Sequence, residues 1–175
     1  VEALGKNGVL LSVPVDCKTL NAAIIIAKVD RRIHTIAVKK GEHQVEKDGS
    51  KNYLSIDFPI TIVGNGDQNE VVVVGGFTIE KGVQGNVHVQ NMTIRHLKGT
   101  GVYGYSPFTL EDVIVEQCGY DGVRACGTAC VARCTNVEVR QCKWSGVSAS
   151  FYGSITLMGA KTTVHHNNTN GSSKY

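Results

Sequence analysis

The sequence is short of aromatic residues, of charged residues and of long hydrophobic runs. Aromatic residues make up 6% and charged residues 19% of its 175 positions, against about one quarter charged residues in an average soluble protein. The longest apolar run covers residues 22–27 and is too short to cross a bilayer, so we expect no membrane partner. The net charge of +3 is typical of a solvated surface, and we expect no nucleic-acid partner.

The six cysteines lack the C-x-x-C pairs that are typical of zinc sites. Cys126, Cys130 and Cys134 recur every four residues with no histidine nearby, a spacing that does not match the usual zinc ligands. We therefore expect no metal site there, and free thiols that pack as small apolar residues.

Glycine and β-branched residues are abundant instead. The chain has 20 glycines and an apolar fraction of 42%, much of it valine and isoleucine. β-Branched residues favour strands and glycine favours turns. The composition predicts an all-β chain, and the length predicts one domain.

A repeat of 21 to 25 residues runs through the second half of the chain. An aliphatic residue at the centre of a β-like phrase recurs at Ile94, Val115, Val139 and Val164. Seven residues after each of them comes a glycine, in the series Gly101, Gly122, Gly146 and Gly171. Four such coincidences indicate a structural repeat with one coil per unit.

Each repeat unit has the two-residue periodicity of strands. Val137 and Val139 alternate with Glu138 and Arg140, and a second alternation follows each glycine. A third short strand precedes each phrase, for example at residues 108–110. Three short strands per coil and no helix predict a parallel β-helix, an all-β solenoid of about six coils.

Equivalent residues of successive coils should lie directly above one another. We expect strand-to-strand corners at Asn91, Asp112 and Asn136, because Asn and Asp tolerate left-handed backbone geometry. We also expect Glu116 and Glu138 to face solvent. One outward column of alternating charge should contain Arg95, Glu116, Arg140 and His165.

The N-terminal end of the solenoid has a predicted cap. Residues 19–30 place four apolar residues on one helical face, and Asp16 or Thr19 can cap the helix start; the four are Leu20, Ala23, Ile24 and Ala27. This divides the chain into an N-terminal segment with a capping helix, residues 1–30, and the coils, residues 31–175. No cap is visible at the C-terminal end, so we expect either a larger parent chain or a homodimer formed through the uncapped C-terminal coil.

With this pattern the sequence resembles the right-handed parallel β-helix family of pectin-lyase-like fold. The resemblance is carried by "TLNAAIIIAKVD", "HTIAVKKGEH", "ITIVGNG" and coils such as "VHVQNMTIRHLKGTGVYG". It implies a right-handed, single-stranded solenoid. The family includes polysaccharide lyases, hydrolases, uronate epimerases and phage tailspikes, so a polysaccharide partner is implied and an activity is not.

The catalytic groups of such enzymes are not recognisable in this chain. A pectate-lyase-like site would need clustered aspartates for Ca²⁺ beside a basic residue, a hydrolase would need paired aspartates, and an epimerase would need an Asp-Pro-His triplet. No cofactor is expected, and Ca²⁺ would apply only to a pectate-lyase-like enzyme. Asp121 and Arg124 are the only weak catalytic candidates.

Outward positions after the repeat glycines form the best candidate binding surface. Aromatic rings stack on sugar rings, and arginine can bind a carboxylate. The candidate substrate-binding residues are Tyr103, Tyr105, Tyr120, Arg124 and Trp144.

Three hypotheses about function follow. The first is a non-catalytic carbohydrate-interacting domain that binds an acidic polysaccharide. The second is a structural or assembly module, such as a surface or virion spike segment, and the third is a polysaccharide lyase, hydrolase or epimerase. The glycosylation sequons at Asn91, Asn167 and Asn170 favour an extracellular or surface location.

Overall fold

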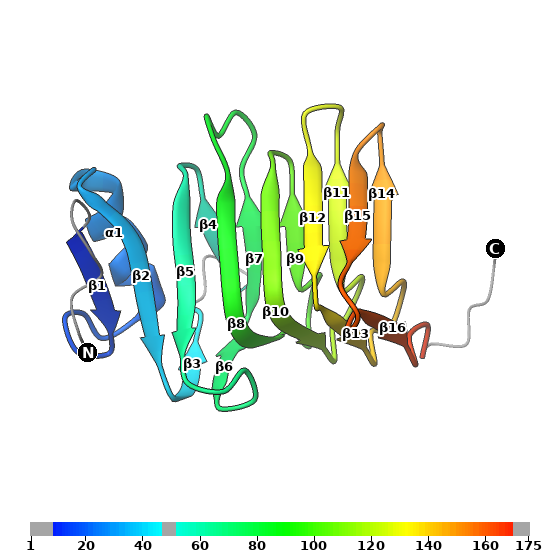
Figure 1. Cartoon of the computed structure of the whole chain (residues 1–175), viewed down its shortest axis with the longest axis horizontal. Coiled ribbons are helices and arrows are strands. Elements are labelled where there is room, and N and C mark those ends of the chain that lie inside the picture. Colours follow the sequence, from blue (N-terminus) through cyan, green and yellow to red (C-terminus); the bar gives the residue numbers. More distant parts are fainter. Residues whose placement is uncertain (1–8, 47–51, 170–175) are drawn as a thin grey trace.

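The chain winds around one axis in about six coils (Figure 1). The computed structural model describes residues 9–46 and 52–169. All strand pairs in these ranges are parallel and join successive coils. The predicted all-β parallel solenoid is therefore confirmed.

Each complete coil contributes to three faces. The first face contains β1 (Val9–Val13), β2 (Ile33–Lys39), β5 (Ile60–Asn65), the first halves of β8 (Val87–Arg95) and β10 (Phe108–Glu116), β12 (Val131–Thr135) and β15 (Ser154–Met158). The second face contains β3 (Gly41–Gln44), β6 (Val71–Val74), the second halves of β8 and β10, β13 (Glu138–Arg140) and β16 (Thr163–His165). The third face is a separate five-stranded sheet of β4 (Tyr53–Ile56), β7 (Gly76–Ile79), β9 (Val102–Gly104), β11 (Val123–Cys126) and β14 (Val147–Ser150).

The pairing register places the repeated aliphatic residues in one stack. Ile94 pairs with Val115, Val115 with Val139, and Val139 with Val164. The repeat predicts that all four are buried in this stack, and the first three are. Val164 is instead 40% exposed, because it lies in the last described coil and no described coil covers it.

The repeat glycines make room for these aliphatic side chains. A Cβ on Gly101 would lie 2.6 Å from Val115 Cγ1, and one on Gly122 would lie 2.4 Å from Val139 Cγ1. Each glycine thus packs against the aliphatic residue of the next coil, which explains why the two recur together. Gly171, the last glycine of the series, lies outside the described residues.

The corners between the first and second faces are turned by single left-handed residues. Asn91, Asp112 and Asn136 have φ angles of 56°, 50° and 53°, as expected for Asn and Asp. At Asn91 the side-chain amide also donates to the Gly64 and Gly66 carbonyls of the preceding coil. The corner column therefore joins coils as well as bending the sheet.

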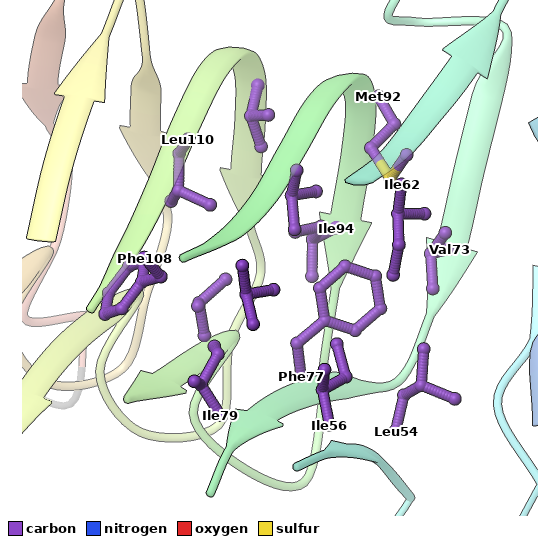
Figure 2. Packing of buried hydrophobic residues seen from close by; sticks show 14 of the residues in the cluster. Leu54, Ile56, Ile62, Val73, Phe77, Ile79, Met92, Ile94, Phe108 and Leu110 are labelled. Carbon is purple, nitrogen blue, oxygen red and sulfur yellow. The ribbon is translucent and has the colours of Figure 1, made fainter. Parts of the chain in front are cut away.

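The core is filled from all three faces (Figure 2). Leu54, Ile56, Phe77 and Ile79 from the third face lie opposite side chains of the other two, and all are buried. Along β4 and β7 of the third face the inward positions are occupied by buried apolar residues, so the outward positions alternate with them and are available for a binding surface.

The predicted capping helix is present as α1 (Leu20–Val29). The Thr19 hydroxyl accepts from the Ala22 amide at the helix start, and the four predicted apolar residues of α1 are buried. β1 precedes it and pairs with β2, a strand that the sequence pattern did not predict. The described residues contain no helix long and apolar enough to span a membrane.

The outward charge column forms as predicted, but Glu116 does not face solvent. Glu116 is 5% exposed, and its carboxylate accepts from Arg95 at 2.6 Å and from Arg140 at 2.8 Å. These two arginines come from the coils on either side and cover it. Burial alone would raise the pKa of Glu116, but the hydrogen bonds and charges of the arginines outweigh burial and hold that pKa below its usual value. Glu138, also expected to face solvent, is half-buried and contacts Arg140 and His165.

The described cysteines are free and mostly buried, as expected. Cys126, Cys130 and Cys134 lie on different parts of a coil, around β11 and β12, rather than around one point. Within residues 9–46 and 52–169, no group of three His, Cys, Asp or Glu side chains is arranged to hold a metal ion.

A charge introduced into the aliphatic stack should destabilise the whole solenoid. Val139 is 1% exposed, so Val139→Asp would bury a carboxylate without a partner and should cost about 3 kcal/mol or more. That corresponds to a fall in Tm of roughly 6–12 °C for a chain of this size. Val131→Asp, on an exposed valine of β12, is the matched control and should change Tm little. A Val139→Asp variant that melts within two degrees of the parent would show that the stack is assigned incorrectly.

The ion pairs of Glu116 should make stability dependent on pH. Because the pKa of Glu116 is lowered by folding, its contribution is complete above the unfolded value of about 4.3 and is lost as the pH falls through the folded value. Glu116→Gln should lower the free energy of unfolding by about 1–3 kcal/mol at pH 7, and the difference should shrink toward pH 3. Denaturant titrations at several pH values measure it, with the exposed Glu42→Gln as control. A difference that stays constant with pH would contradict the assignment.

Candidate functional site

The candidate binding residues lie on the outer side of the third face. The register joins Ser55, Thr78, Tyr103, Arg124 and Ser148 in one outward column. From Ser55 to Arg124 the inward neighbours of this column are buried residues of the core, whereas beside Ser148 the side chain of Val147 is half-buried and Ala149 is exposed. The sequence alternation after each repeat glycine therefore sets which side chains reach this surface.

All five predicted binding residues line one groove of about 380 Å³. Three further residues line it that sequence analysis did not identify, and the full lining is Tyr53, Thr78, Thr100, Tyr103, Tyr105, Tyr120, Arg124 and Trp144. The lining comes from coils between β4 and the turn before β14. At ~4.8 Å per coil, four steps give a groove roughly 20 Å long, which is enough for an oligosaccharide.

Four of the five aromatic rings of the groove are arranged in two pairs. Tyr103 and Tyr105 have ring centroids 4.6 Å apart with a tilt of 34°. Tyr120 and Trp144, from the same turn of successive coils, have centroids 4.8 Å apart with a tilt of 55°. Trp144 and Tyr120 are also substantially exposed. The groove thus presents apolar ring faces and edges to solvent between its polar hydroxyl groups.

Tyr53 is held at its end of the groove by a buried histidine. Its ring meets the His96 ring edge-on, with centroids 4.6 Å apart, and its hydroxyl accepts from the Thr100 amide at 2.9 Å. A Cβ on Gly99 would lie 2.4 Å from His96 Cε1 and 2.5 Å from the Tyr53 hydroxyl, so only glycine fits there. Burial lowers the pKa of His96, which keeps the imidazole neutral.

The hydroxyl groups of Tyr103 and Tyr53 stay protonated. Burial, followed by hydrogen bonds to Tyr105 and Cys126, raises the pKa of Tyr103 well above its usual value. Burial also raises the pKa of Tyr53. These groups can therefore donate and accept hydrogen bonds, as recognition of sugar hydroxyls requires.

Asp121 and Arg124 form a compact polar cluster beside the aromatic pairs. Arg124 lies over the Tyr103 ring with its guanidinium carbon 5.5 Å from the centroid. Its two terminal nitrogens donate to Asp121 at 3.4 Å and to Ser150 at 3.3 Å, and its Nε atom is buried with no partner among the described residues. Arg124 is thus held in place from both neighbouring coils.

Asp121 is 3% exposed and both of its carboxylate oxygens are occupied. Oδ1 accepts from the Ser145 amide at 3.1 Å, and Oδ2 accepts from the Ser148 hydroxyl at 2.9 Å as well as from Arg124. Ser145 and Ser148 belong to the next coil. Asp121 therefore joins two coils and positions Arg124, and it does not line the groove itself.

The strand register shows how a groove residue that sequence analysis did not identify could have been found. Gly76 directly precedes Phe77, which pairs with Val102 as Val102 pairs with Val123, so Gly76 has the register position of a repeat glycine. Thr78 follows it by two residues, as Tyr103 follows Gly101 and Arg124 follows Gly122. Gly76 in turn pairs with Tyr53, which lies one coil earlier. Extending the glycine series to Gly76 would have identified Thr78.

Two features define this fold: the successive parallel coils in fixed register, and the three faces around one core. The chain is a parallel β-helix protein. No family model matches the sequence, and no curated protein matches it. One similar solved structure is described as the catalytic domain of GH87 alpha-1,3-glucanase in complex with nigerose, with 16% sequence identity and a TM-score of 0.44. The match covers 97% of this β-helix and 35% of that structure, so the chain spans about a third of its length.

Proposed function

We propose that this β-helix is a carbohydrate-interacting domain that binds a polysaccharide along the groove of its third face, without catalysing a reaction. The observation that carries the proposal is the convergence of five aromatic side chains and Arg124 from successive coils in one groove. Sugar rings have apolar faces that pack on aromatic rings and hydroxyl edges that need hydrogen bonds. The groove offers both kinds of contact along its length.

The chemistry around Asp121 supports a binding role over an enzymatic one. A general acid or base must reach the proton that it transfers. Asp121 is buried and bonded through both oxygens, and the eight lining residues of the groove include no carboxylate. Asp121 and Arg124 therefore serve this proposal as structural and positioning groups rather than as an acid–base pair.

Trp144 provides a direct measurement of binding, because it is the single tryptophan of the chain. A screen against a glycan array, followed by titration of the strongest glycans, should change Trp144 fluorescence in a saturable way. Tyr120→Ala removes the ring that packs on Trp144 and should weaken binding about tenfold, or ~1.4 kcal/mol.

Tyr152→Ala is the matched control, since Tyr152 is 89% exposed and does not line the groove. It should leave the dissociation constant unchanged. If no array glycan binds, the proposed function is wrong. If Tyr152→Ala weakens binding while Tyr120→Ala does not, the binding surface lies elsewhere.

The last described coil favours a second, compatible role in assembly. β14, β15 and β16 are the outermost strands of their sheets at this end, and Leu157, Met158 and Val164 are partly exposed there. Strand edges with unpaired backbone groups and apolar side chains are surfaces that pair with other strands. We infer that this end associates with the same end of a second copy, because a two-fold axis gives a closed contact.

Light scattering over a dilution series tests this association. The chain should shift from monomer to dimer as its concentration rises, and Val164→Lys should keep it monomeric by placing a charge in the contact. Val29→Lys is the control at the opposite end, where Val29 of α1 is exposed. A parent chain that stays monomeric at high concentration, or a dimer that Val29→Lys abolishes and Val164→Lys does not, would overturn the inference.

A further inference from the structure

The groove of the third face is close to electrically neutral. Arg124 is the only charged residue among its eight lining residues. Its charge is compensated locally, because Asp121 lies 3.4 Å away and is almost fully buried. The remaining lining consists of aromatic rings and hydroxyl groups.

The contacts of Arg124 within the protein also fix its orientation. Each terminal nitrogen donates one hydrogen bond, to Asp121 and to Ser150, and Nε is buried without a partner among the described residues. One face of the guanidinium lies against Tyr103. A carboxylate on a ligand would have to compete with Asp121 for this cation, and the two negative charges would repel each other.

Resting on the proposed function, we propose that the groove selects a neutral glycan, made of uncharged hexose or pentose units, over a uronate-containing one. This differs from the acidic ligand that the sequence suggested from Arg124 alone. Arg124 is held by hydrogen bonds at the edge of the aromatic surface of the groove, and it does not serve as a counterion for the ligand. Binding should then depend on ring stacking and hydroxyl contacts, which salt screens very little.

The test compares neutral hexaoses of glucose, xylose and galactose with hexagalacturonate, using Trp144 fluorescence at low and high salt. At least one neutral hexaose should bind at least tenfold more tightly than hexagalacturonate, with a dissociation constant that does not change with salt. Tighter, salt-sensitive binding of hexagalacturonate would overturn the selectivity and leave the proposed function intact. Absence of binding by every neutral and anionic glycan would reject the proposed function itself.

Two variants examine the role of the Asp121–Arg124 pair. Asp121→Asn removes the compensating charge and should strengthen hexagalacturonate binding at least tenfold at low salt, an increase that high salt abolishes. Arg124→Gln should weaken the best neutral hexaose and hexagalacturonate by similar factors. Loss of hexagalacturonate binding alone would show that Arg124 is a free anion site.

Arg133→Gln is the matched control, because Arg133 is an exposed arginine on the first face. It changes the net charge as Arg124→Gln does and should alter neither ligand's binding. The Arg124→Gln comparison remains decisive if Asp121→Asn does not fold, since it leaves the Asp121 contacts with the next coil in place.

Discussion

The contact between a glycine and the aliphatic residue of the next coil sets the spacing of this solenoid. Backbone hydrogen bonds on three faces hold successive coils about 4.8 Å apart. At that spacing Val115 fills the space where a Gly101 side chain would be, and Val139 does the same at Gly122. Neither partner can change alone, because a larger residue at the glycine would push the coils apart and a smaller aliphatic residue would leave a cavity.

The same constraint separates the residues that fold the chain from those that can bind a ligand. Inward positions after each glycine are apolar and fixed by the core, while outward positions meet only solvent and their neighbours in the column. Thr78, Tyr103, Arg124 and Ser148 occupy equivalent outward positions with nearly identical backbone surroundings. Their chemical differences are therefore not set by the requirements of the coil.

Sequence reasoning succeeded where the repeat is regular and failed where contacts depend on neighbouring coils. The stack of Ile94, Val115 and Val139, the cap at Thr19 and the meeting of the five candidate residues in one groove all follow from periodicity, because register converts spacing into position. β1 and Tyr53 were missed because the early coils lack the regular glycine spacing. The burial of Glu116 was missed because two arginines of adjacent coils cover it, and side-chain coverage is not visible in an alternation of residue types.

Repulsion between like charges in a stacked column explains why the groove has only one charged lining residue. Side chains one coil apart are about 4.8 Å from each other. In a column of cations for a polyanionic ligand, neighbouring cations would therefore repel one another in the absence of the ligand. Such a column needs counterions from the protein, as the second face shows by alternating Arg95, Glu116 and Arg140. On the third face the column has a single cation, and its counterion, Asp121, is buried beneath it. The rest of the groove lining consists of aromatic rings and hydroxyl groups, which need no counterion from the protein.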